Sequence, residues 1–221
     1  MIKTQGKYGQ ANVYTDNLEN SAYGQMAQSD IPYELAYLYG EKMENYMPDM
    51  AFMQAFADLN RTIIKEVILD GMKLTEEESF TTIHNYIDTE SMILRKGAVS
   101  AKADERLLIP MNMRDVSLIC IGLGNEKWNY SAPYGAGRLL RRKEAFNSFT
   151  MDAYKNNTEV IFTTSVNKDT LDECPMVYKP MEEIMRNING TVTVNKIIKP
   201  IYNFKASENA TNKKQIKEMT E

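Results

Sequence analysis

One short segment of the sequence combines small residues with a run of positive charge. Gly135–Gly137 have no bulky side chain, so their backbone N–H groups can approach an anion closely. Four basic residues follow: Arg138, Arg141, Arg142 and Lys143. If a helix starts after Gly137, its N-terminal dipole adds to the attraction, and the segment predicts a phosphate site. The alternative, which spacing alone leaves open, is a glycine-rich turn before a solvated basic helix.

Few side chains in the sequence could hold a metal ion. His84 is the single histidine, and Cys120 and Cys174 lie far apart without a Cys-x-x-Cys spacing. The cysteines therefore indicate neither a zinc knuckle nor a disulfide framework, and they favour a reducing, cytoplasmic compartment. As an isolated residue, His84 is interpreted more readily as a hydrogen-bonded histidine at a helix end than as a metal ligand.

Composition excludes several classes of protein. A chain of 221 residues, 43% of them hydrophobic, can bury a core as one large or two small domains, which excludes general disorder. With 26 basic and 30 acidic residues, the formal net charge of -4 argues against a protein that holds nucleic acid by bulk charge alone. The absence of long apolar runs predicts neither a signal peptide nor a membrane span.

Helical spacing dominates the sequence before Glu90. Asp30 is a good N-cap for a helix expected to stop near Tyr46. A second, longer helix is expected after a break at Pro48 and ends around Gly71. The capping-box pattern at residues 75–78 predicts a short helix toward His84.

After Glu90 the pattern turns to short β-branched or apolar runs bounded by Gly, Pro and Asp, which are typical of strands. The expected strands are Met92–Val99, Leu107–Ile109, Val116–Gly122, Val160–Thr164 and one or two within Val192–Phe204. Further helices are expected after Gly137 and over Pro180–Ile188, and a frayed polar tail from Ala206. Helices followed by strands predict an α+β, or mixed α/β, fold.

The glycine segment also carries a resemblance to a known family. Its run SAPYGAGRLLRRKEA, Ser131–Ala145, resembles the signature loop of the RtcB family of RNA-splicing ligases, whose approximate pattern is SxPHGAGRxxSRxxA. Other family blocks occur in the right order: Ile83–Tyr86 with Glu90, Arg95–Ala98, Ile109–Pro110 with Met113 and Ser117, Asp172–Pro175 with Tyr178–Lys179, and Lys205. The resemblance predicts an N-terminal segment over residues 1–28 similar to the family's start, an RtcB-like nucleotide-binding region over 30–205, and the tail over 206–221.

This resemblance implies a fold and a reaction. The fold is that of the C-terminal half of an RtcB protein, with helices packed on a mixed sheet. The reaction joins an RNA 3'-phosphate or 2',3'-cyclic phosphate to a 5'-hydroxyl with GTP and manganese, in tRNA splicing or RNA repair. A histidine is guanylylated, GMP passes to the RNA 3'-phosphate, and the 5'-hydroxyl displaces GMP. Such phosphoryl transfer depends on metals and cationic side chains that stabilise charge. The implied partners are GTP and RNA with tRNA-like ends.

The resemblance also assigns roles position by position. It places His84 at a manganese ligand, Asn112 and Ser117 against the nucleotide, Gly135, Ala136 and Gly137 at the α-phosphate, Arg138 and Arg142 near the phosphates, Tyr178 and Lys205 around the guanine, and Tyr134 at the guanylylated histidine. From the residues alone other roles stay open. The basic side chains could form a solvated helix face, Tyr178 a core-edge aromatic, and Lys205 the first lysine of the tail. Trp128 and Tyr130 either pack a loop base or stack on unpaired bases.

The sequence departs from the family at the residues that carry the chemistry. Tyr134 replaces the nucleophilic histidine, and a phenol with an ordinary pKa of about 10 is almost entirely protonated at neutral pH. The Asp-x-x-Cys, Gly-Asn-His and Gly-Ser-Arg motifs of the family's middle section are not found, and Gln28–Asp30 is the expected seam. One histidine cannot hold two manganese ions in the family's way.

Two main hypotheses follow, and they leave open whether the chain is an enzyme. The first is an RtcB-like RNA ligase by descent, impaired or inactive in this chain. The second is a non-catalytic RNA- or nucleotide-binding remnant, or a partner of a full-length ligase. A third is a shortened product with no function beyond folding. Loss of a middle section would expose apolar surface, so self-association into a homo-oligomer is also expected.

Overall fold

The computed structural model describes residues 38–205. The expectations for residues 1–37 and 206–221, which include the helix start at Asp30 and the frayed tail, lie outside the described residues. The described residues divide into two compact units, 38–78 with Tyr86–Leu94, and Ser79–Asn85 with 95–205. The division into segments 1–28, 30–205 and 206–221 stays a prediction.

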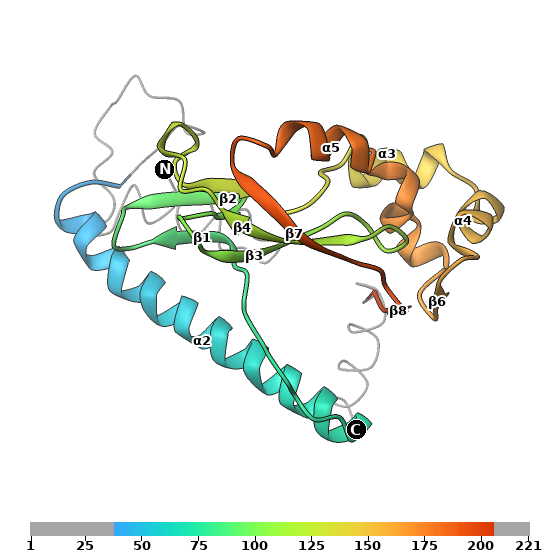
Figure 1. Ribbon diagram of the computed structural model, residues 1–221, viewed down its shortest axis with the longest axis horizontal. Coiled ribbons are helices and arrows are strands. Elements are labelled where there is room, and N and C mark those ends of the chain that lie inside the picture. The colour runs from blue at the N-terminus through green and yellow to red at the C-terminus, as the bar shows by residue number, and fades with distance from the viewer. Residues whose placement is uncertain (1–37, 206–221) are drawn as a thin grey trace, which may run out of the picture. The chain divides into compact units, whose positions relative to one another are not determined.

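In the first unit, one long helix replaces the two that Pro48 was expected to separate. Helix α2 runs over Glu41–Met72 with Pro48 inside it (Figure 1). Near the start of so long a helix, the single backbone hydrogen bond that proline removes is outweighed by the turns that follow. The helix ends at Met72 and is capped by Lys73, which has a left-handed backbone (φ 53°) and donates its N–H to the carbonyl of Asp70.

The helix predicted from the capping box at residues 75–78 is wrong. The structure has no helix between Lys73 and His84, and the chain enters strand β1 (His84–Asp88) instead. Tertiary contacts outweigh the local pattern here, because Thr82 Oγ1 accepts a hydrogen bond of 2.9 Å from the N–H of Leu108. This bond fastens the segment to a neighbouring strand in an extended form.

The described residues after α2 form short strands, most of them antiparallel, and the predicted strands are confirmed. Strands β3 (Arg106–Pro110), β4 (Ser117–Gly122) and β7 (Val192–Ile198) form one sheet in the order β3-β4-β7. A second sheet has the order β1-β2-β5, with β2 over Ile93–Ser100 and β5 over Ser131–Pro133. Strands β6 (Phe162–Thr163) and β8 (Tyr202–Asn203) pair in parallel.

Short helices gather at one end of the β3-β4-β7 sheet, where α5 lies over it (Figure 1). They are α3 (Arg142–Ser148), α4 (Met151–Thr158), α5 (Met181–Asn187) and the 3-10 turns Lys168–Glu173 and Pro175–Val177. A further 3-10 turn, Glu126–Trp128, follows the other end of β4. Helix α5 confirms the prediction over Pro180–Ile188. The basic helix expected after Gly137 begins only at Arg142, so Gly135–Gly137 do not lie at a helix N-terminus. After Gly137 the chain pairs with the segment around Tyr178 instead, and the N–H of Leu139 donates to the carbonyl oxygen of Val177.

Two apolar clusters hold these elements together. Ile184 of α5 and Ile188, which caps this helix, pack against the inward-facing residues of β3 and β4, among them Leu107 and Leu118. The second cluster joins α3, α4 and the 3-10 turns around Tyr154, Cys174 and Val177. Helices packed on antiparallel sheets make this an α+β fold, as predicted from the sequence. Among residues 38–205, no helix is long and apolar enough to cross a membrane.

Candidate functional site

A cleft of about 600 Å³ lies where the ends of β3 and β7 meet the start of β4. In the sheet register Ser117 faces both Pro110 and Ile198, so the three strands meet at this edge. The cleft lining includes every residue that the sequence assigned to a nucleotide or a nucleophile: Asn112, Ser117, Tyr134, Gly135, Ala136, Gly137, Arg138, Arg142, Tyr178 and Lys205. The remaining site residue, His84, contacts this set through the ring of Tyr134.

The glycine loop follows β5 directly and offers backbone donors to the cleft. Within the described part of the chain, no protein acceptor is bonded to the amide N–H groups of Gly135, Ala136 or Gly137. Gly137 has a left-handed backbone (φ 72°), and a Cβ on Gly135 would stand 3.0 Å from the carbonyl oxygen of Pro110. Glycine is therefore favoured at both positions, and the loop can present its amides to an anion without a helix dipole.

Arg138 is held by two adjacent carboxylates rather than by solvent. Its guanidinium lies 3.1 Å from Glu173 Oε1 and 3.6 Å from Asp172 Oδ2, and it also donates to the backbone carbonyl of Asp172. The side chain is only 24% exposed, so it does not belong to a solvated helix face. Arg142 also approaches Asp172 Oδ2, at 3.6 Å, but its side chain is 62% exposed. Of the two arginines, Arg142 is the more accessible to a ligand.

Glu173 connects three of the predicted site residues. Its carboxylate accepts a hydrogen bond of 2.6 Å from the hydroxyl of Tyr178 and lies 3.4 Å from Lys205 Nζ, besides its contact with Arg138. Burial alone would raise the pKa of Glu173, but the Tyr178 hydrogen bond and the charges of Lys205 and Arg138 hold this pKa below its ordinary value. Glu173 is therefore ionised at neutral pH and fixes the positions of these side chains.

The pKa values of Asp172 and Tyr178, which lie beside Glu173, are raised rather than lowered. Burial, together with the charge of Glu173, raises the pKa of Asp172. Burial and the hydrogen bond to Glu173 likewise raise the pKa of the Tyr178 phenol, which stays protonated and donates. Lys205 and Tyr178 are thus neither a loose tail residue nor a simple core-edge aromatic, because both belong to the ion-paired cluster around Glu173.

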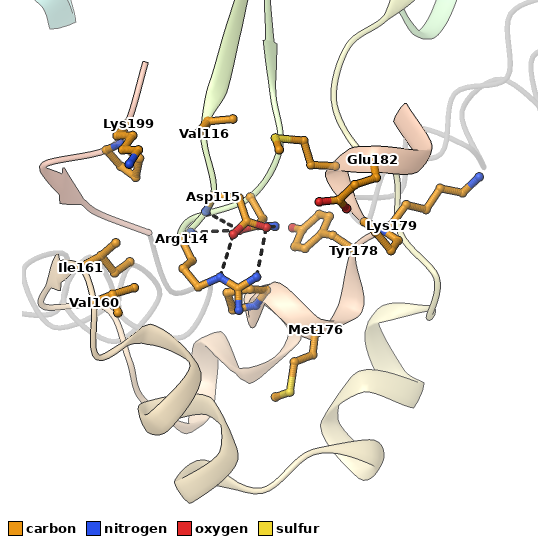
Figure 2. A pocket seen from close by; sticks show the side chains of 15 residues that line it. Arg114, Asp115, Val116, Val160, Ile161, Met176, Tyr178, Lys179, Glu182 and Lys199 are labelled. Carbon is orange, nitrogen blue, oxygen red and sulfur yellow. Dashed lines mark hydrogen bonds and ion pairs between the residues drawn. The ribbon is translucent and has the colours of Figure 1, made fainter. Parts of the chain in front are cut away.

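The turn between β3 and β4 forms another wall of the cleft and also lines a second cavity. Asn112 Oδ1 accepts the backbone N–H groups of Arg114 and Asp115, each at 2.9 Å. The guanidinium of Arg114 donates to both carboxylate oxygens of Asp115, at 2.7 and 3.1 Å, which lowers the pKa of Asp115. The second cavity, of about 590 Å³, shares Asp115 and Tyr178 with the cleft, and Figure 2 shows these side chains from within it.

His84 and Tyr134 form a stacked pair beside the glycine loop. Their ring centroids lie 4.6 Å apart and the ring planes differ by 6°. His84 is the first residue of β1, not the end of a helix, and Tyr134 directly follows β5. Strands from two distant parts of the sequence therefore place one ring on the other.

Comparison with known protein families shows which family the chain belongs to. A family model described as tRNA-splicing ligase RtcB matches residues 10–206. The chain belongs to the RtcB family. It is 31% identical over 180 residues to RNA-splicing ligase RtcB of Escherichia coli strain K12, an alignment that covers 73% of this chain and 44% of that protein. It is 30% identical over 180 residues to RNA-splicing ligase RtcB1 of E. coli strain ATCC 25922, with the same coverage of 73% and 44%. The chain thus spans less than half the length of these RtcB relatives.

The described residues do not fit the manganese centre that RtcB membership suggests. Over residues 38–205, no three His, Cys, Asp or Glu side chains come together in a group that could hold a metal ion. Metal sites built mainly from protein side chains, such as those of zinc, normally have three or more such ligands. We therefore derive no chemical step through manganese for this chain.

The cleft does fit a phosphorylated nucleotide such as GTP. Two buried side-chain atoms of lining residues, the donor Arg138 Nε and the acceptor Asn203 Oδ1, have no hydrogen-bond partner among the described residues. Because buried polar atoms are normally hydrogen-bonded, a ligand with one acceptor and one donor would satisfy both. The cleft volume lies within the range of about 300–1,000 Å³ that small-molecule sites occupy.

Sequence reasoning did not single out Asp172, Glu173 or Asn203 as site residues. Asp172 and Glu173 stand in one of the family blocks, and two adjacent acids before a proline in an apolar segment were the available signal. Their partner Arg138 lies 35 residues before Glu173, so their role follows from packing and not from local spacing. No sequence pattern indicated Asn203, because its neighbours in the chain predict only a closing strand.

Proposed function

We propose that this chain is a nucleotide- and RNA-binding member of the RtcB family, descended from an RNA ligase, that does not itself become guanylylated. Its ligands would be GTP and the phosphorylated ends of tRNA-like RNA, as in tRNA splicing or RNA repair in the cytoplasm. The observation that carries the proposal is the cleft in which the amides of Gly135–Gly137, unbonded among the described residues, lie next to the accessible Arg142.

In the cleft, each group would have a separate task. The amides of Gly135–Gly137 would donate to a phosphate group, and Arg142 would pair with its charge. Glu173 would hold Arg138, Tyr178 and Lys205 in place around the rest of the nucleotide. Binding by oriented amides and cations needs neither a metal ion nor a nucleophile, which is why descent from a ligase is compatible with a purely binding role.

Guanylylation is not proposed, because Tyr134 lacks the means to act as a nucleophile. A phenol must lose its proton to attack a phosphate readily, and it needs a neighbouring base or a metal ion to do so at neutral pH. The contact that the structure gives its ring is a stack on His84, not a hydrogen bond to a base. The other reading of the family, an active ligase, requires a covalent guanylate on this residue.

Incubation of the chain with radiolabelled GTP and manganese is therefore expected to leave no covalent label after denaturing electrophoresis. The E. coli RNA-splicing ligase RtcB serves as the positive control for the conditions. A labelled band that disappears in Tyr134→Phe would contradict the proposal and establish Tyr134 as the nucleophile. Noncovalent binding of GTP, followed by filter retention without denaturation, shows that the protein used is folded and competent.

Binding of a short single-stranded RNA with a 3'-phosphate is expected to depend on Arg142. Arg142→Ala should weaken binding about fivefold and reduce the slope of log affinity against log salt concentration by about 1, as expected for the loss of one phosphate contact. The matched control is Lys143→Ala, which removes the same charge from the next residue, outside the cleft lining. Equal losses in the two variants, or RNA binding that is indifferent to salt, would refute a specific phosphate contact at Arg142.

A further inference from the structure

The stacked pair of His84 and Tyr134 is unexplained by the binding of a phosphate or of a nucleotide in the cleft. The two rings are almost parallel, 6° apart, with centroids 4.6 Å from each other. Both side chains are exposed, and that of Tyr134 reaches 40% of its full accessibility. Two large aromatic rings thus stand at the surface beside a cationic cleft rather than in the core.

The backbone on either side of the pair is shaped to hold it. Gly97 has a left-handed backbone (φ 70°), and a Cβ built there would lie 3.6 Å from the ring of Tyr134. Its N–H donates to Asn85 Oδ1 at 2.9 Å, which ties the residue after His84 to the neighbouring strand. The register of β2 and β5 pairs Ala98 with Pro133, the residue before Tyr134. The same strands therefore fix both rings.

Exposed aromatic rings beside a phosphate-binding loop are suited to bind an unpaired nucleobase. An exposed aromatic face offers a base a stacking surface, and it does so for every base because each has a π-face. Tyr134 is the residue immediately before the Gly135–Gly137 amides, so a nucleotide whose phosphate meets those amides has its base near the pair. Within a duplex both faces of a base are already stacked, so this surface favours an unpaired base in a single strand.

We propose that His84 and Tyr134 form a stacking platform for the unpaired base at the end of a single-stranded RNA. The inference rests on the proposed RNA binding and adds the subsite that takes the base. Tyr134 supplies the ring next to the phosphate loop, and His84 supports it from the other side, so both act by binding. No bond to the RNA is made or broken at either residue.

The test measures binding of a short RNA whose 3'-terminal nucleotide carries 2-aminopurine and a 3'-phosphate, because the fluorescence of this base falls when it stacks. We expect quenching on binding to the wild-type chain. Tyr134→Ala should lose most of the quenching and bind about tenfold more weakly, whereas Tyr134→Phe should stay within about twofold of the wild type. His84→Ala should weaken binding and His84→Phe should restore it. An imidazole acting as a metal ligand predicts instead that both His84 variants fail alike, and such a result would overturn the platform.

A second measurement keeps the test independent of how well each variant folds. An otherwise identical RNA with an abasic 3' end should bind the wild-type chain about tenfold more weakly than the normal RNA, and Tyr134→Ala should not weaken it further. Equal binding of normal and abasic RNA by the wild type would overturn the platform while leaving salt-dependent RNA binding intact. Failure of the wild type to bind any RNA would overturn the proposed function as well, so the two failures are distinguishable.

Discussion

Replacing Arg138 with alanine is expected to lower the free energy of unfolding by about 3 kcal/mol at neutral pH. The substitution removes the cation shared by Asp172 and Glu173 and leaves two mostly buried carboxylates side by side. Removing one partner from a buried ion pair costs more than the pair contributes, because the remaining charge stays desolvated. Urea unfolding monitored by circular dichroism measures the loss.

Arg142→Ala is the matched control for this stability experiment. Arg142 approaches the same Asp172 oxygen at 3.6 Å, but its side chain is 62% exposed. An exposed ion pair contributes about 0.5 kcal/mol or less, so this variant should unfold almost as the wild type does. Equal losses in the two variants would show that burial of the Arg138 cluster does not determine its energy.

The pH dependence of the Arg138→Ala effect gives a further check on its cause. Arg138 lowers the pKa of both Asp172 and Glu173, so without it both pKa values rise in the folded state. For each carboxyl, the resulting difference in unfolding free energy between wild type and variant is present above the folded pKa values of both proteins and absent below them, because the unfolded pKa is common to both. The difference should therefore be largest at pH 7 and shrink as the pH falls through the folded pKa values of Asp172 and Glu173. A difference independent of pH would contradict the electrostatic explanation.

The sequence predicted those elements whose burial follows their own periodicity. In β4 every second residue is buried, so its pattern was visible without knowledge of its neighbours. Strand β5 was missed because its three residues, including Pro133, have no strand pattern and pair only because β2 is alongside. The prediction of a helix break at Pro48 was wrong for the opposite reason. The backbone hydrogen bond that one proline removes is outweighed by the rest of the helix around it.

The candidate site could be predicted where its residues are contiguous or belong to a family block. Gly135–Gly137 and Arg138 were visible in this way, although the helix expected after them starts four residues late, at Arg142. The roles of Asp172 and Glu173 could not be predicted, because a solvated acidic pair and a buried partner of arginine look alike in a sequence. The stack of His84 on Tyr134 was equally hidden, since it depends on the order of strands β1-β2-β5.

The β1-β2-β5 sheet also contains a residue outside the cleft whose substitution is expected to destabilise the fold more than substitution of the residues that line the cleft. Arg95 of β2 is only 2% exposed, yet it carries a charge. Its Nε donates to Ser131 Oγ at 2.9 Å, and its Nη2 lies 3.3 Å from the carbonyl oxygen of Tyr130 and 3.4 Å from that of Asn129. Both Asn129 and Tyr130 have left-handed backbones, with φ of 49° and 50°. Arg95 therefore compensates the strained loop that leads into β5 and Tyr134.

Arg95→Ala is expected to cost about 4 kcal/mol of folding free energy, because it leaves buried carbonyls without donors and opens a cavity where the side chain lay. Arg95→Lys keeps the charge but not the forked donors, and should recover about half of the loss. Lys96→Ala, at the exposed next residue, is the control and should change stability by less than about 0.5 kcal/mol. Urea unfolding of the three variants measures these differences. A loss below about 1 kcal/mol in Arg95→Ala would mean that the loop keeps its shape without the guanidinium, and that the positions of β5 and the stacked Tyr134 do not depend on it.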